Sequence, residues 1–129
     1  MKIAFDTLGE NPNQPSSAIN YLIEFVRFFK SEENTEILLL VSNKNRHLFP
    51  KADNIKLVNC FFSNENILLR ILSQQILIPL YLLYYNADLI YSPLNSAPLF
   101  TNKPVFLKIN TLFQYEMQDH SNENLYNRL

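Results

Sequence analysis

Five consecutive aliphatic residues, Ile37 to Val41, restrict the fold more than any other segment of this sequence. Neighbouring side chains of a strand point to opposite faces, so an uninterrupted apolar run is apolar on both faces. Such a strand has to be covered by helices on both sides, as the central strands of parallel sheets are. The segment therefore predicts an α/β protein in which this strand is buried.

Four further segments have the length and composition of short strands, and they alternate with helical patterns. These segments are Lys2–Asp6, Ile55–Val58, Asp88–Tyr91 and Val105–Ile109. Between the first two strands, apolar residues recur at the spacing of one helix face, at Ile19, Leu22, Ile23, Val26 and Phe29. The alternation predicts a Rossmann-like parallel sheet with helices on both faces and right-handed crossovers. We expect the strand order 3-2-1-4-5.

Residues 66–86 are also predicted to be helical, but Pro79 cannot donate a backbone hydrogen bond and clashes with the preceding turn. We expect a break there, with Pro79 opening a second helix. The apolar stretch from Ile67 to Tyr85 is interrupted by Arg70, Ser73, Gln74, Gln75 and Pro79. These interruptions argue against a membrane span. One side of the stretch is a candidate for peripheral contact with a membrane surface.

The 129 residues suit a single domain, 1–129, and the net charge of −1 argues against a nucleic-acid partner. Cys60 is the only cysteine, which indicates a reducing compartment, and the first residues do not resemble a signal peptide. We therefore expect a cytoplasmic location, with the inner face of the membrane as the alternative. Residues 111–129 are polar and contain no further strand pattern, so the domain is predicted to be incomplete at its carboxyl end, poorly soluble and prone to self-association.

Ligands of open parallel sheets bind beyond the carboxyl ends of the strands, where the strand order reverses. In the expected order this crevice lies between the loops after the first and fourth strands, close to the segment after the fifth. The predicted substrate-binding residues are Asp6, Gly9, Ser16, Ser17, Pro93, Asn95 and Asn110. The two serines also suit a helix cap, and Asp6 equally suits a turn, so a purely structural role stays open for these three.

Recognised catalytic motifs are missing. No G-x-G-x-x-G or Walker loop occurs. The two histidines, His47 and His120, are isolated from other potential metal ligands. Cys60 is predicted to be a small buried apolar residue. No cofactor, no metal site and no catalytic acid, base or nucleophile is therefore predicted.

Four segments, taken in order, carry a resemblance to a known family. They are Met1–Asp6, the helix start Ser17–Leu22, Gln75–Pro79 and Ala87–Asn95. The chain resembles the amino-terminal domain of retaining GT-B glycosyltransferases, which build bacterial polysaccharides and glycolipids. The resemblance implies the acceptor-side half of an enzyme that moves a sugar from a nucleotide-sugar donor to an acceptor hydroxyl, the acceptor being a sugar or a lipid-linked molecule. It also implies a second domain, or a partner chain, that binds the nucleotide.

Two departures from the family pattern bear on function. Asn13-Gln14-Pro15-Ser16 stands where the family has a Gly-Gly pair, and Asn110-Thr111 replaces the His-Asp pair after the fifth strand. Asn110 can form hydrogen bonds but cannot carry a charge. The alternative is therefore a non-catalytic binding or interaction module with the same fold. A receiver or flavodoxin-like domain is disfavoured, because Asp6 alone does not make the acidic cluster of a receiver.

Overall fold

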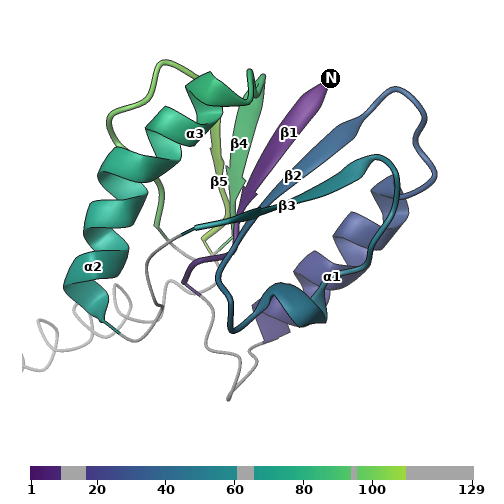
Figure 1. The fold of residues 1–129 in the computed structure, drawn as a ribbon, viewed down its shortest axis with the longest axis horizontal. Helices are drawn as coiled ribbons and strands as arrows, with labels where there is room; N and C mark the ends of the chain where they lie inside the picture. Colours follow the sequence, from purple (N-terminus) through teal and green to yellow (C-terminus); the bar gives the residue numbers. More distant parts are fainter. Residues whose placement is uncertain (10–16, 61–65, 94–95, 110–129) are drawn as a thin grey trace, which may run out of the picture.

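Five parallel strands form one sheet in the computed structural model of the chain, which describes residues 1–9, 17–60, 66–93 and 96–109 (Figure 1). The strands are β1 (Lys2–Asp6), β2 (Glu36–Val41), β3 (Ile55–Asn59), β4 (Leu89–Ser92) and β5 (Val105–Leu107). Their order across the sheet is β3-β2-β1-β4-β5. The predicted fold class and strand order are confirmed; β1 has the predicted bounds, and the other four strands differ from the predicted ones by one or two residues.

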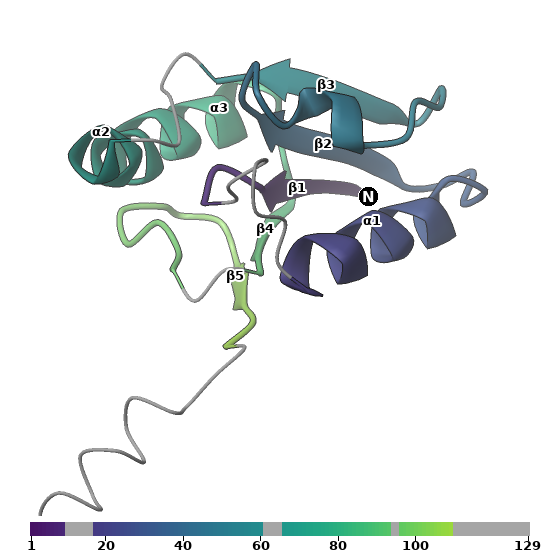
Figure 2. The same cartoon turned by 90° about the horizontal axis from the view of Figure 1, so that it is seen from below.

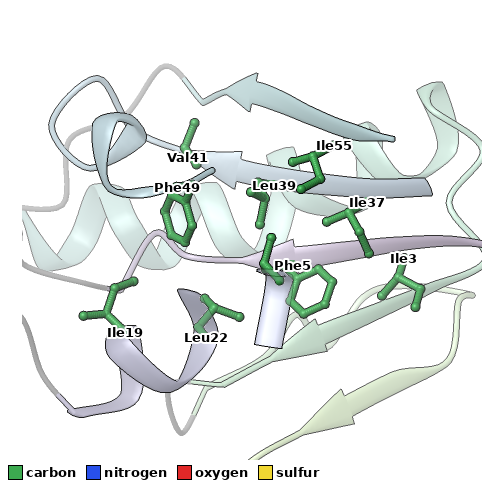
Figure 3. Close-up of a cluster of buried hydrophobic side chains, with 10 residues drawn as sticks. Ile3, Phe5, Ile19, Leu22, Ile37, Leu39, Val41, Phe49 and Ile55 are labelled. Carbon is green, nitrogen blue, oxygen red and sulfur yellow. The ribbon is translucent and has the colours of Figure 1, made fainter. Parts of the chain in front are cut away.

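Helix α1 (Ser17–Phe29) covers one face of the sheet, as the apolar spacing predicted. Figure 3 shows Ile19 and Leu22 of this helix pointing toward β1 and β2. Fully or almost fully buried side chains of both strands meet them there, among them Phe5 and Leu39. Tyr21 and Phe28 of the same helix are exposed. Burial of this cluster is the main reason that α1 and the central strands hold together.

The opposite face is covered by one long helical segment (Figures 1 and 2). It consists of α2 (Ile67–Leu72), a π-helical turn η2 (Ser73–Leu77) and α3 (Ile78–Tyr84). Ile78 and Leu82 are completely buried against the sheet together with Ala4, Leu38 and Ile90. The central strands β1 and β2 are therefore covered on both faces, as the apolar run of β2 requires.

Pro79 does not break the helical segment, contrary to our expectation. It occupies the first turn of α3, where its missing N–H is harmless, and η2 joins the two helices without interruption. In a π turn the N–H donor bonds five residues back, as Ile78 does to Ser73. The widened turn absorbs the disturbance that a proline causes in an ordinary α-helix.

The π turn also explains an unusual repeat in this segment. Sheet-facing residues recur every four positions at Gln74, Ile78 and Leu82. An ordinary α-helix has about 3.6 residues per turn, so a strict four-residue repeat would rotate away from the sheet. Because η2 contains more residues per turn, Gln74, Ile78 and Leu82 stay on the side that faces the sheet.

Strand β5 forms the edge of the sheet beyond β4. Its three residues, Val105, Phe106 and Leu107, are all exposed, and no described element covers either of its faces. A short 3₁₀ turn, η1 (Arg46–Leu48), lies at the other side of the sheet between β2 and β3. The described part of the sheet is thus covered at β3, β2 and β1 and open at β5.

Candidate functional site: a polar cluster at the carboxyl edge of the sheet

Asp6 ends β1 at the carboxyl edge, where the topology predicts a binding crevice. Its Oδ1 atom accepts a hydrogen bond from the Leu8 N–H at 3.0 Å. Its Oδ2 atom accepts one from Nε2 of Gln74 at 2.8 Å, and the same Nε2 donates to Ser96 Oγ at 3.1 Å. The cluster of Asp6, Gln74 and Ser96 therefore joins β1, the π turn and the loop after β4.

Asp6 is buried, and no described basic side chain forms an ion pair with it. Burial raises the pKa of its carboxyl group, because the charged form loses its hydration. The hydrogen bonds from Gln74 and from the Leu8 N–H, and the positive charge of Arg70, act in the opposite direction but do not cancel this effect. Asp6 is thus a buried carboxyl group that holds its proton more readily than an ordinary aspartate does.

Two buried hydroxyl groups, those of Ser92 and Ser73, belong to the same face. The strand register pairs Phe5 with Tyr91, which places Ser92 beside Asp6, and Ser73 precedes Gln74 in the π turn. Neither hydroxyl has a hydrogen-bond partner within the described ranges. An unpaired buried hydroxyl costs about 1–3 kcal/mol, so these two groups are unsatisfied polar atoms close to Asp6 and Gln74.

A second network holds the loop after β1 in place. Oγ1 of Thr7 donates to the Leu40 carbonyl at 2.7 Å, and Nδ2 of Asn45 donates to the Thr7 carbonyl at 2.9 Å. Oδ1 of Asn45 accepts the Ser42 N–H at 2.9 Å. Because all three side chains are buried, these bonds fix the ends of β1 and β2 to each other and thereby fix the position of Asp6.

The loop after β4 is fixed to the π turn by Gln75. Its Nε2 atom donates to the Ala97 carbonyl at 3.2 Å, and its Oε1 atom accepts the Leu99 N–H at 2.8 Å. One side-chain amide thus satisfies a donor and an acceptor of the loop backbone. Together, Gln74 and Gln75 make the π turn the element that joins the end of β1 to the loop after β4.

The structure brings some of the predicted site residues together. Asp6 and Pro93 are buried at the adjacent ends of β1 and β4, and Gly9 lies in the turn after β1. Ser17 is the first residue of α1 and is exposed. Ser16, Asn95 and Asn110 lie outside the described residues.

Sequence reasoning missed Gln74, Ser73, Ser92 and Ser96. A signal was present, because two polar residues in the middle of an apolar helical stretch have to be paired if they face a sheet. That face could not be identified from a regular helical period, since the π turn changes the phase of the helix at that point. In the sequence alone, Gln74 appears only as an interruption of the apolar stretch.

Other groups are less well placed for chemistry. Burial, with a smaller contribution from the nearby Asp6 charge, raises the pKa of the Cys60 thiol to about 12, so the reactive thiolate is scarce at neutral pH. His47 is exposed in η1, and no three potential metal ligands gather anywhere in the described ranges. Two open hollows, of about 580 and 310 Å³, lie at the amino edge of the sheet and are lined largely by exposed acidic and amide residues. The buried polar cluster at the carboxyl edge is the better candidate, because its unpaired groups are built into the core.

The fold and the cluster define a Rossmann-like α/β domain whose polar groups converge where the strand order reverses. Comparison with protein-family models, with curated proteins and with solved structures found no match.

Proposed function

We propose that the chain is the acceptor-side domain of a cytoplasmic glycosyltransferase that moves a sugar from a nucleotide-sugar donor to an acceptor hydroxyl. The observation that carries the proposal is the convergence of Asp6, Gln74 and two unpaired buried hydroxyls at the switch point of the sheet. Sugars are recognised through many hydroxyl groups, which pair well with carboxylate, amide and serine oxygen atoms. The order of the sequence motifs adds further support.

In such an enzyme this domain contributes binding and orientation rather than a covalent step. Asp6 accepts a hydrogen bond from an acceptor hydroxyl, and the Ser73 and Ser92 hydroxyls hold neighbouring hydroxyls of the same ring. Fixing the acceptor in this way lowers the barrier by positioning the attacking oxygen atom. A second domain, or a partner chain, binds the nucleotide diphosphate and stabilises its developing charge.

Binding of sugars to the full chain tests the proposal directly. We expect mono- and disaccharides to shift the backbone amide NMR signals around Asp6, Ser73 and Ser92. The double variant Ser73→Ala/Ser92→Ala should weaken that binding about tenfold, since each serine supplies one hydrogen bond to the ligand. Ser42→Ala is the matched control, because Ser42 also has a buried hydroxyl without a partner but lies at the end of β2. Equal binding by the double variant and the control would contradict the proposed site.

Catalysis is tested by mixing the chain with candidate nucleotide-binding domains and measuring transfer of a labelled sugar from uridine- and guanosine-diphosphate sugars. We expect transfer only with both domains present. Asp6→Ala should reduce it, and Ser42→Ala should leave it unchanged. Absence of transfer in every combination, with sugar binding intact, would favour the alternative below.

A non-catalytic sugar-binding module is the second candidate. It is favoured by the state of Asp6, whose two oxygen atoms already accept hydrogen bonds from Leu8 and Gln74, and by the lack of a second acid or base at the described part of the cluster. A module of this kind would bind sugars with the same dependence on Ser73 and Ser92 and would show no transfer.

A further inference from the structure

One side-chain amide at the carboxyl edge serves two partners with the same atom. Nε2 of Gln74 donates one proton to Oδ2 of Asp6 at 2.8 Å and the other to Oγ of Ser96 at 3.1 Å. An amide has two donors on its nitrogen atom and only acceptors on its oxygen atom, so a half-turn of the group exchanges the two kinds. The orientation of the Gln74 amide therefore depends on whether its partners need a donor or an acceptor.

Protonation of Asp6 reverses what this carboxyl group needs from Gln74. Oδ1 of Asp6 accepts the Leu8 N–H at 3.0 Å, which favours Oδ1 as the acceptor oxygen and Oδ2 as the site of an added proton. The new O–H donor on Oδ2 then requires an acceptor, and the Nε2 side of Gln74 offers none. A half-turn of the Gln74 amide brings Oε1 to this position and restores the hydrogen bond.

The surroundings of Asp6 favour its neutral form. Loss of hydration on burial raises its pKa, and the positive charge of Arg70 on α2 lowers the pKa without cancelling this effect. Cys60 after β3 and Tyr81 of α3 pack on the same side of the sheet. Burial raises the pKa of both, so these two groups stay neutral while Asp6 titrates.

Ser96 is the exposed member of this group of three residues. While Asp6 is charged, Oγ of Ser96 accepts a hydrogen bond from Gln74, and the hydroxyl proton of Ser96 points to other acceptors. After the half-turn, Oε1 of Gln74 faces both partners, and the Ser96 hydroxyl donates its proton to Oε1. The buried carboxyl group and the exposed hydroxyl group are thereby connected through one amide.

We propose that Asp6, Gln74 and Ser96 form a proton-controlled relay, in which protonation of Asp6 reverses the Gln74 amide and changes the Ser96 hydroxyl from a donor to ligands into an acceptor. The proton comes from solvent, and no other covalent bond changes. With Asp6 charged, Ser96 suits carbonyl or phosphate oxygen atoms of a ligand; with Asp6 neutral, it suits O–H and N–H groups. The relay is a property of the free chain and does not depend on the proposed sugar chemistry.

Gln75 is an internal control for the relay. Its Nε2 atom donates to the Ala97 carbonyl, and its Oε1 atom accepts the Leu99 N–H. Neither backbone group titrates, so both ends of this amide keep their partners at every pH. The two neighbouring glutamines therefore differ in the one property that the proposal concerns.

NMR spectroscopy of the full chain over a series of pH values tests the relay, with circular dichroism to verify that the chain is folded at each pH. We expect the side-chain amide signals of Gln74 to shift with the same midpoint as the Asp6 carboxyl carbon, and those of Gln75 to stay unchanged. The nuclear Overhauser effect between the Nε2 protons of Gln74 and the β protons of Ser96 should be present above the midpoint and lost below it. Titration of Asp6 without loss of this effect would overturn the proposal, as would an Asp6 that keeps one protonation state throughout.

Two variants test the relay without relying on acid. Asp6→Asn keeps an oxygen atom for the Leu8 N–H and presents an NH₂ group to Gln74, so it imitates the protonated carboxyl group and should lack the nuclear Overhauser effect at every pH. Gln74→Met keeps the length of the side chain but removes the amide, so the β-carbon signal of Ser96 should no longer follow the Asp6 midpoint. Persistence of the effect in the first variant, or of the Ser96 shift in the second, would show that Gln74 does not connect the two residues.

Discussion

The buried carboxyl group of Asp6 links the stability of the fold to pH. Burial raises the pKa of Asp6 in the folded state above its ordinary value, and the unfolded chain restores that ordinary value. Between the two values the folded state binds more protons than the unfolded state. The contribution of Asp6 to the free energy of unfolding is therefore present at low pH and is lost as the pH rises through this window.

Replacing Asp6 by Asn should remove this pH dependence. The variant keeps an oxygen atom to accept the Leu8 N–H, and it has no charge to bury. We expect the unchanged chain to lose stability relative to Asp6→Asn as the pH rises from the acidic range to neutrality. Urea unfolding of both proteins at a series of pH values measures the difference, and two parallel stability profiles would show that Asp6 does not titrate as stated.

At the same scale, the sequence identified Asp6 but not its partners. Asp6 could be predicted because it directly follows an apolar strand that the topology places at the switch point. Gln74 lies 68 positions further along the chain, on a helix whose phase changes within the π turn, and no local rule relates the two. Burial of Ser92 beside Asp6 depends on strand register, which is fixed only when the strands pair.

Among the elements, the strands were predictable because their apolar runs have few other stable environments. The run from Ile37 to Val41 appears as the central part of β2, covered on both faces. The helical segment was less predictable, since the effect of Pro79 depends on how the preceding turn adapts. The substitution of a π turn for a break reflects tertiary packing of Ile78 and Leu82, which holds both helices against the sheet.

Asn54 fixes the carboxyl end of α1. Its Nδ2 atom donates to the Phe29 carbonyl at 2.7 Å and to the Thr35 carbonyl at 3.1 Å, joining the end of α1, the turn before β2 and the turn before β3. We expect Asn54→Ala to lower the free energy of unfolding by about 1–3 kcal/mol, because partly buried carbonyl groups lose their donor. Chemical denaturation measures this value. Asn59→Ala is the control, since Asn59 is exposed and bonds only to the Asn43 side chain among the described residues, and its effect should stay within about 0.5 kcal/mol.

At the scale of the whole molecule, the two edge strands of the sheet differ in how well they are buried. Strands β3 and β5 are the two edge strands of the described sheet, but β3 buries Ile55 and Val58, whereas all three residues of β5 are apolar and exposed. Unpaired strand edges are templates for pairing with another chain. The predicted self-association is therefore expected to begin at β5.

A charge on β5 should reduce such association. We expect Phe106→Lys to shift the chain toward the monomer in sedimentation velocity runs at increasing concentration, because a lysine on an edge strand disfavours pairing with a second edge. The Phe28→Gln variant removes an equally exposed aromatic ring from α1 and should associate like the unchanged chain. A monomeric unchanged chain at every concentration would contradict the expectation.

The π turn has a further consequence for how this sequence can change. One turn of η2 holds about one residue more than a turn of an α-helix. A one-residue deletion within Ser73–Leu77 should therefore restore an ordinary α-helix while α2 and α3 keep nearly their present phase, so that Ile78 and Leu82 stay in the core. Such a deletion instead disturbs the side chains that the widened turn carries, Gln74 with its bond to Asp6 and Gln75 with its bonds to the loop after β4. Deletion of one residue inside α3, by contrast, should rotate every later position of that helix by about 100° and uncover the core.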